Sequence, residues 1–541
     1  MYLRLFLYSC LFALYSCGVP NPSDVTEGDY LEAPFTGLDT LATNDWWNRA
    51  DNPIIRMDIG RDSVIAFGVY TVADQVLKLS AQLYPLYPGE SKEVSLDLKQ
   101  DGKWVEVARQ KVNELGWSAL FRVEDWDENQ TTPYRLRHEA GATFAGSIRA
   151  APAMDEEFVL AAFSCNSNKD RGDRDEYVRN IEYLDPDLLF FAGDQSYDHK
   201  EHTAAWLKFG QQFREAFRHR PMIAIPDDHD IGQGNLWGEG GKIAEVQAGH
   251  DGGYFFHHEY VKMVERCQTA HLPDPYDATP VEQGIGVYYT SYKLGPVDFA
   301  IIEDRKFKSG PFGKIPQMGP RPDHVNDPTY DPATIDLPGL KLLGDRQLAF
   351  LENWSQAESA GRMKAVLSAT GFCGGAHLHG NKEGRLHADL DSNGWPQTGR
   401  KKAISLIKAA NAVHIAGDQH LATIIQHGIE EFADGPLAFV VPAIVNNYYS
   451  RWWWPADEQA GGKPIYNSPL AWTGDYLDGF NNKISMYAYA NPDSEANGAG
   501  FGVVRFHPEK REVTLECWPR TVDLSQPDAK QFPGWPFTMK P

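Results

Sequence analysis

The sequence predicts two domains, a small all-β sandwich followed by a layered α/β domain. Apolar and polar residues alternate from about residue 53 to 150, as in half-buried strands. After Pro152, short apolar runs alternate with helical patterns, which is typical of layered α/β folds. A chain of 541 residues is also too long for one ordinary domain. We therefore predict a β-sandwich over residues 46–152 and an α/β domain over 153–541.

The first residues resemble a bacterial export signal. Within residues 1–16, Arg4 precedes the apolar stretch 5–14, which is too short to span a membrane as a helix. The sequence Leu14-Tyr15-Ser16-Cys17 resembles a lipobox, so Cys17 is the predicted lipidated residue; a plain secretory signal is the alternative. Polar, turn-rich residues 17–45 are typical of a tether. We expect an exported lipoprotein anchored to a membrane of the bacterial cell envelope.

The sandwich is predicted from short alternating strands. Residues 77–83 and 94–98 alternate in hydropathy, and Asp101-Gly102 provides a hairpin turn before a strand at 104–107. Further strands are expected at 117–123, 132–137 and 142–150.

The α/β domain is predicted from strands and helices that follow one another. Four aromatic residues, Trp206, Phe209, Phe213 and Phe217, recur at helical spacing. Further helices are expected at 176–184 and 346–357, strands at 158–165, 187–194, 221–225, 363–370 and 412–418, and hairpins at 286–304 and 501–518.

The composition is that of a folded, acidic protein. Hydrophobic residues make up 42% of the chain and charged residues 23%. The net charge of −23 argues against a nucleic-acid-binding surface, because such surfaces need clustered Lys and Arg, and it favours metal cations as partners. The cysteine spacing shows no disulfide framework, and Cys267 and Cys517 are predicted to be buried thiols.

Four clusters of polar residues follow predicted strands: 164–166, 193–198, 227–230 and 417–420. Loops at the carboxyl ends of parallel strands usually build an active site, so these clusters are expected to converge. Gathering Asp194, Asp228 and Asp418 would be destabilising unless cations neutralised them. Carboxylates bind hard cations such as Ca²⁺ and Mg²⁺, whereas a thiolate and a phenolate, from Cys165 and Tyr197, suit ferric iron. The sequence therefore predicts a polynuclear metal centre.

These clusters, FSCN, GDQSYD, DDHD and GDQH, resemble in this order the motifs of the alkaline phosphatase D (PhoD-like) branch of the calcineurin-like metallophosphoesterases. Glu303-Asp304-Arg305 and the segment LGDRQLAFLENW resemble further family segments, so the resemblance spans roughly residues 158–425. It implies a metallophosphoesterase-type catalytic domain, and the preceding sandwich fits the family's N-terminal module.

The resemblance implies a ligand for each metal. Cys165, Asp194 and Tyr197 would hold Fe³⁺, and Asp194 would bridge to Ca²⁺ or another divalent ion such as Zn²⁺, Mn²⁺ or Mg²⁺. The remaining implied ligands are Asp228, Asp418 and His420, with Asn235 as an extra ligand.

The function implied is hydrolysis of phosphomonoesters, phosphodiesters or both, by in-line attack of a metal-bound hydroxide on phosphorus. His229 would protonate or steady the leaving oxygen. Arg305 either grips a nonbridging phosphate oxygen or forms a structural ion pair with a nearby Asp. Asp227 and Asp230 are expected to support the ligands.

Other functions and site features stay open. The same centre could hydrolyse another ester, in a phospholipid or a sulfated or phosphorylated glycan, or the chain could be a noncatalytic binding lipoprotein. The His-x-His at 377–379 either lines the pocket or lies in a noncatalytic loop. The aromatic stretch 448–454 either forms a wall for an organic part of the substrate or packs between domains.

Overall fold

The computed structural model describes residues 38–39, 41–42, 52–139, 141–376, 378–379, 386–445, 451–453, 468–491 and 498–541. Its N-terminal part is a sandwich of two antiparallel sheets, with strand orders β1-β2-β5 and β4-β3-β6-β7. The strands are β1 (Ile65–Ala73), β2 (Val76–Leu83), β3 (Glu93–Gln100), β4 (Lys103–Lys111), β5 (Ser118–Val123), β6 (Thr132–Arg137) and β7 (Thr143–Ile148). The predicted all-β domain is confirmed.

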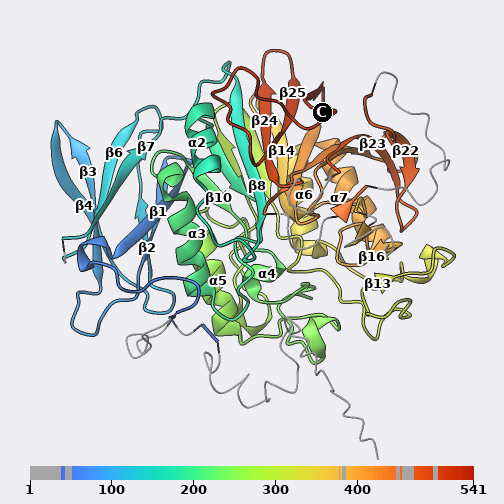
Figure 1. Ribbon diagram of the computed structural model, residues 1–541, viewed down its shortest axis with the longest axis horizontal. Helices are drawn as coiled ribbons and strands as arrows, with labels where there is room; N and C mark the ends of the chain where they lie inside the picture. The colour runs from blue at the N-terminus through green and yellow to red at the C-terminus, as the bar shows by residue number, and fades with distance from the viewer. Residues whose placement is uncertain are drawn as a thin grey trace, which may run out of the picture.

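Two further sheets form the centre of the α/β domain (Figure 1). The first has the order β10-β9-β8-β24-β25-β26, with β20 also paired to β8. Its strands are β8 (Phe158–Asn166), β9 (Leu188–Phe191), β10 (Met222–Ala224), β20 (Ala443–Val445), β24 (Gly500–His507), β25 (Glu512–Pro519) and β26 (Phe537–Met539).

The second sheet has the order β11-β12-β14-β17-β19-β18-β23-β22. Apolar side chains of both sheets, such as Leu160, Phe190, Phe299 and Val413, are fully buried in one shared cluster, so the sheets pack face to face. The strands are β11 (Thr290–Leu294), β12 (Val297–Ile301), β14 (Met363–Thr370), β17 (Ala412–Gly417), β18 (Thr423–His427), β19 (Leu437–Val440), β22 (Gly474–Leu477) and β23 (Lys483–Tyr489).

Helices cover the outer faces of these two sheets. Residues of α2, α3 and α5 pack into the cluster that also contains the sandwich, while α6 and α7 share a cluster with the second sheet. The helices are α2 (Asp175–Leu184), α3 (His202–Phe217), α4 (Asp228–Ile231), α5 (His258–Thr269), α6 (Gly344–Gln356) and α7 (Gln397–Ala409). Short strands lie in the loops at β13 (His324–Val325), β15 (Leu378–His379), β16 (Ala388–Asp389) and β21 (Arg451–Trp452). The predicted layered α/β class is confirmed.

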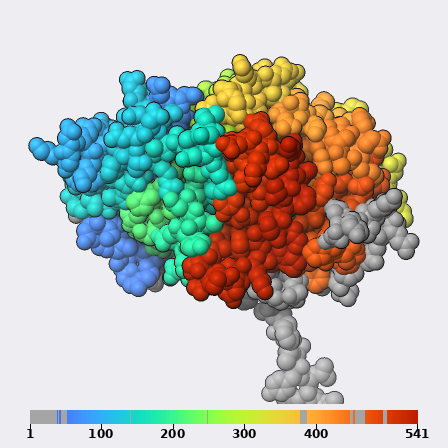
Figure 2. Space-filling model, turned by 90° about the horizontal axis from the view of Figure 1, so that it is seen from above, coloured from blue at the N-terminus to red at the C-terminus, as the bar shows by residue number. Residues whose placement is uncertain are grey.

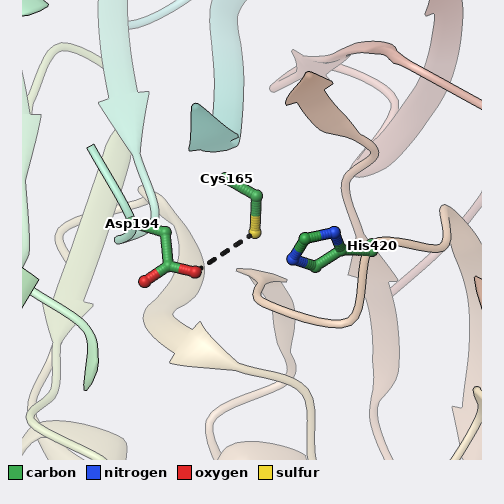
Figure 3. A group of neighbouring side chains, drawn as sticks. All are labelled: Cys165, Asp194 and His420. Carbon is green, nitrogen blue, oxygen red and sulfur yellow. Dashed lines mark hydrogen bonds between the residues drawn. The ribbon is translucent and has the colours of Figure 1, made fainter. Parts of the chain in front are cut away.

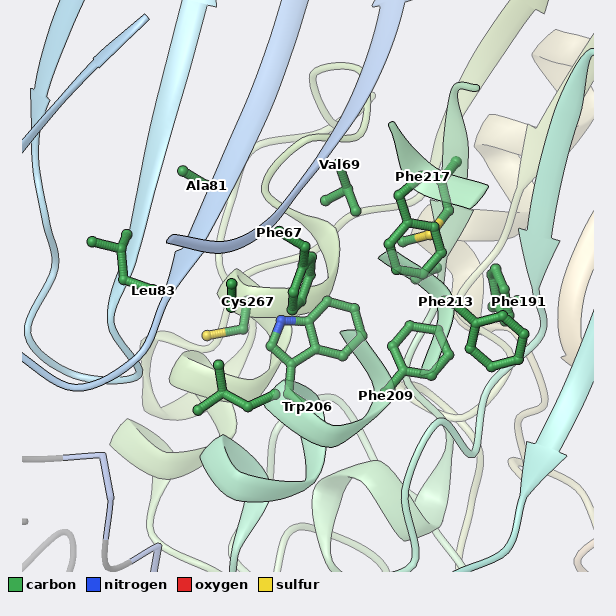
Figure 4. Packing of buried hydrophobic residues seen from close by; sticks show 14 of the residues in the cluster. Phe67, Val69, Ala81, Leu83, Phe191, Trp206, Phe209, Phe213, Phe217 and Cys267 are labelled. Carbon is green, nitrogen blue, oxygen red and sulfur yellow. The ribbon is translucent and has the colours of Figure 1, made fainter. Parts of the chain in front are cut away.

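The α3 aromatic residues fix the sandwich against the α/β domain. Trp206, Phe209 and Phe217 are buried, and Trp206 packs edge-on against Phe67 of β1 with ring centroids 5.4 Å apart. Phe191 of β9 packs on the other side of this group (Figure 4). The helical spacing seen in the sequence therefore marks an interdomain core.

The predicted hairpin at 501–518 forms β24 and β25. These two strands lie inside the first sheet, although they come from the end of the chain. β24 pairs antiparallel with β8, so the end of the chain completes the sheet that the first α/β strand begins. In the space-filling view the C-terminal residues lie between the sandwich and the later part of the α/β domain (Figure 2).

Part of the predicted tether is packed. Leu38, Asp39 and Leu41 are buried, and Asp39 Oδ2 accepts hydrogen bonds of 2.9 Å from the Thr203 backbone N–H and hydroxyl at the start of α3. Cys17 and the predicted signal lie outside the described residues. Among the described helices, none combines the length and apolar character needed to cross a bilayer.

Candidate metal centre

The carboxyl ends of parallel strands bring the four predicted clusters to one place. β8, β9 and β10 are parallel neighbours in the first sheet, and they lead to Cys165, Asp194 and Asp228. β17 of the second sheet leads to Asp418, whose backbone N–H donates to the Ser164 hydroxyl at 3.0 Å. The two sheets therefore meet at the predicted site.

One group of side chains combines sulfur, oxygen and nitrogen donors. Cys165, Asp194 and His420 point toward one another (Figure 3), and each offers a ligand atom within 4.8 Å of the others. The Cys165 Sγ lies 3.7 Å from Asp194 Oδ2. The Tyr197 hydroxyl donates to the same Oδ2 at 2.7 Å and lies 3.0 Å from His420 Nε2. The iron ligands implied by the resemblance are thus brought together, with His420 beside them.

A second group consists of carboxylates. Asp194, Asp227, Asp228 and Asp418 offer oxygens within 4.8 Å of one another. Burial, and then neighbouring carboxylates, raise the pKa of Asp194 well above its ordinary value, and burial followed by Asp194 does the same for the pKa of Asp228. Burial raises the pKa of Asp418 to about 6.

Two buried oxygens show that this carboxylate group fits cations. Asp194 Oδ1 and Asp228 Oδ1 are shielded from solvent and receive no hydrogen bond from the described residues. A buried oxygen without a partner is costly, and a cation would satisfy it. Asp194 belongs to both groups, which is the position that a bridging ligand requires.

The backbone at the site is held in an uncommon conformation. Cys165, Asp194, Asp418 and His420 have φ angles of 57°, 59°, 66° and 53°. Residues other than glycine rarely adopt this left-handed region, and such residues cluster at functional sites. Gly417 allows the close approach of the strands, because a Cβ there would lie 2.1 Å from the Ser164 hydroxyl.

Asp230 holds the loops that carry the ligands. Its Oδ2 accepts the backbone N–H of Asp194 at 2.7 Å and that of Asp227 at 3.0 Å. Its Oδ1 accepts from the Gln268 amide at 3.1 Å, and its side chain is buried. The supporting role predicted for Asp230 therefore has a geometric basis.

Replacing Asp230 by asparagine is expected to lower metal affinity about 10- to 100-fold, because an amide cannot accept both backbone N–H groups at one end and the Gln268 amide at the other. Metal titration of the chelated protein measures this. Asn180→Asp, a buried isosteric change on α2 outside the site, serves as the control and is expected to leave metal affinity unchanged. Wild-type metal affinity in Asp230→Asn would contradict the role.

Arg305 lies among carboxylates. Its Nε is 2.6 Å from Asp227 Oδ1, its Nη1 is 2.6 Å from Asp391 Oδ1, and its Nη2 is 3.2 Å from Asp418 Oδ1. The guanidinium is almost fully buried. Of the two roles considered for Arg305, this geometry matches the structural ion pair.

A cavity of about 670 Å³ opens over both groups. His229 lines it, packs against Tyr197 with ring centroids 4.1 Å apart and the rings tilted by 36°, and has its Nδ1 2.5 Å from His199 Nε2. Asn235 also lines the cavity, and its amide donates to Asp323 Oδ2 at 2.5 Å. Both predicted residues therefore face the same space as Asp194 and Asp228.

Several residues of the site were not predicted from the sequence. Asp391, which lines the cavity, and Asp323, which contacts Asn235, follow no recognisable motif and lie in loops between β12 and α7. His199 lies two residues after Tyr197, and its position directly after the second cluster was a usable signal.

Three other sequence features are the His-x-His at 377–379, the aromatic stretch 448–454 and the two cysteines predicted to be buried. The side chains of 377–379 and most of 448–454 lie outside the described part. Trp453 is fully buried and packs edge-on against Tyr476 of β22, so it lies in a core of the α/β domain and not between the domains, while Arg451 of the same stretch lines the cavity. Cys267 and Cys517 are buried free thiols, as predicted.

Comparison with solved structures supports the same fold. The structure of PhoD superimposes with a TM-score of 0.62 over 88% of this chain and 91% of that chain, at 14% sequence identity. This chain shares the PhoD fold. A purple acid phosphatase, PPD1 from yellow lupin (Lupinus luteus) seeds, superimposes with a TM-score of 0.53 over 88% of this chain and 73% of that chain, at 11% identity. No protein-family model matches the sequence, and no curated protein matches it significantly. The metallophosphoesterase-type fold predicted from the motifs is confirmed.

Proposed function

We propose that the protein is a metal-dependent phosphoester hydrolase acting on phosphomonoesters, phosphodiesters or both. The observation that carries this proposal is the pair of adjoining donor groups that share Asp194 at the floor of a cavity. The PhoD fold, reached at low sequence identity, and a purple acid phosphatase among similar structures support it.

The donor atoms suggest which residues hold which ion. Cys165, Asp194, Tyr197 and His420 combine the donors that suit Fe³⁺, and Asp194 with Asp228 and Asp418 offers the oxygens that suit Ca²⁺ or another divalent ion. Bound metal ions would activate water and offset the charge of the transferring phosphoryl group.

The chain's own residues orient the ester. His229 faces the cavity, and its contact with His199 orients the ring, so that His229 is placed to protonate or steady the leaving oxygen. Arg305 acts as a positioning residue, because its contacts hold Asp227, Asp391 and Asp418 in place.

We also propose an envelope location. The apolar stretch 5–14 and the lipobox-like residues ending at Cys17 support an exported protein with an N-terminal lipid anchor. Lipid labelling of the expressed protein, lost in Cys17→Ser, tests this; a soluble, unlabelled wild-type protein would favour the plain secretory signal.

Removal of metal is expected to abolish hydrolysis of an aryl phosphate and of an aryl phosphodiester. It should also lower the melting temperature, because a metal present at about 100 times its dissociation constant stabilises the native state by about 2.7 kcal/mol. Turnover and thermal melts after chelation, and after adding back Fe³⁺ and Ca²⁺ separately, measure both effects.

Elemental analysis of the gently purified protein identifies the ions. A protein that contains no metal, and that hydrolyses neither ester when metal is supplied, would favour the noncatalytic binding alternative. Hydrolysis of a phospholipid or a sulfated glycan in place of both aryl esters would favour the other ester class.

A further inference from the structure

The cavity extends well beyond the metal groups. A volume of about 670 Å³ is typical of sites for organic ligands and far exceeds the needs of a phosphoryl group. Besides the predicted ligands, apolar residues line the cavity, namely Val246, Ala248, Phe312, Pro320 and Pro322, and with Arg321 they form what we call the outer wall. An organic portion of the substrate has a preformed apolar surface there.

Two side chains of this outer wall suit a flat ring. Phe312 lines the cavity and is 45% exposed, so its ring is accessible to a ligand there. Arg321 lines it too, with 47% of its side chain exposed. The Arg321 Nε and Nη2 donate to Asp323 at 3.1 Å and 2.8 Å, which fixes the plane of the guanidinium by its edge. Stacking on its flat face does not compete with that pair.

A buried carboxylate holds this wall rigid. Asp323 is fully buried, and besides Arg321 it contacts Asn235 at 2.5 Å and His250 Nε2 at 3.4 Å. Asn235 and His250 also line the cavity. The wall is therefore a built surface and not a chance arrangement of loop residues.

The charges decide which organic group fits. The Arg321 charge is already compensated by Asp323, and Arg451, the other arginine that lines the cavity, lies 3.9 Å from Asp389; Asp391 and Asp418 line the cavity too. A second anion on the substrate would meet these carboxylates, whereas an uncharged planar ring gains apolar contact and stacking. The surface therefore favours a ring over an anion.

We propose that the preferred substrates are phosphate esters whose alcohol carries a planar ring, which stacks on Phe312 and Arg321. The ring is an aryl group or a nucleobase. This inference rests on the proposed phosphoesterase function for its role in turnover, although ring binding can be measured separately.

The test compares esters matched in their reacting bond. Adenosine monophosphate is paired with ribose phosphate, and benzyl phosphate with cyclohexylmethyl phosphate, which has similar bulk but no flat ring. We expect kcat/KM in the wild type to favour the ring by about tenfold, since stacking of a base on an aromatic side chain strengthens binding. Phe312→Leu and Arg321→Met should each lower that ratio several-fold.

Controls and binding measurements separate the outcomes. Tyr183→Leu, a change of an exposed aromatic residue on α2, should leave the ratios unchanged. Calorimetry compares the affinity of benzylphosphonate with that of cyclohexylmethylphosphonate. Because neither compound is hydrolysed, this comparison measures ring binding without turnover. A preference only in the benzyl pair identifies an aryl ring, and one only in the adenosine pair a nucleobase.

Ratios near one for both pairs and both phosphonates in the wild type, or wild-type ratios in both cavity variants, would overturn the proposal. If no ester is hydrolysed while the phosphonates still differ in affinity, the phosphoesterase function fails and the ring subsite stands.

Discussion

Replacing Asp228 by asparagine is expected to abolish ester hydrolysis and to make the metal-free protein more stable. Asp228 Oδ1 is buried without a hydrogen bond from the described residues, and burial and Asp194 raise the pKa of this side chain. Activity should fall by more than about 100-fold. Replacing even a residue that only hydrogen-bonds to a metal ligand typically lowers metal affinity or activity by about 10- to 100-fold. The metal-free variant gains stability because it no longer buries an unpaired carboxylate among others.

The stability gain has a defined pH dependence. A carboxyl group with a raised pKa in the folded state binds more protons folded than unfolded, so its cost is absent below the ordinary value of 3.8 and grows as pH rises. Urea unfolding of chelated proteins should therefore show a larger difference between Asp228→Asn and wild type at pH 8 than at pH 4.

The matched control is Asp298→Asn on β12. Asp298 is also buried, but it accepts a hydrogen bond from Trp354 Nε1 at 2.9 Å and does not line the cavity. It should keep activity, and because burial raises the pKa of Asp298 as well, the loss of activity is what separates the two variants. An Asp228→Asn protein that still hydrolyses both aryl esters would remove Asp228 from the metal centre.

Replacing Arg305 by methionine should lower the free energy of unfolding by about 3–5 kcal/mol, because removing one partner of a buried ion pair leaves charge uncompensated. Here the affected carboxylates are Asp227, Asp391 and Asp418. Arg305→Lys keeps the positive charge, but lysine lacks the planar guanidinium that contacts several carboxylates at once. The Arg305→Lys variant should therefore be destabilised, but by less than Arg305→Met. Urea unfolding measures both variants.

Arg109→Met on β4 is the surface control. Arg109 pairs with Glu106 at 3.1 Å but is half exposed, and loss of such a solvent-screened pair should leave the free energy of unfolding nearly unchanged. If Arg305 instead gripped the substrate phosphate, Arg305→Lys would raise KM strongly and leave the unfolding free energy near that of the wild type.

Much of the fold was predictable because local patterns agree with it. The alternation at 77–83 became β2, the apolar run at 158–165 became β8, and the spacing of Trp206 and Phe213 became the buried face of α3. The pairing of β24 with β8 was not predictable, since it joins residues more than 300 positions apart and depends on the whole sheet forming.

In the site, too, some features could be predicted from the sequence and others could not. Cys165, Asp194, Asp228 and Asp418 were identifiable because polar residues that follow apolar strands must gather at one sheet edge. The role of Arg305 stayed open in the sequence, since its partners Asp227 and Asp391 approach it from different loops.

The sequence by itself determined the order of strands and helices and the donor atoms available at the carboxyl ends of the strands, because hydropathy period and residue chemistry are local properties. Only the tertiary structure decided that Asp194 is shared by two donor groups, that Arg305 is enclosed by carboxylates, and that Phe312 and Arg321 line the same cavity. Those facts depend on distances between residues remote in the chain, which packing of the two sheets and their loops fixes.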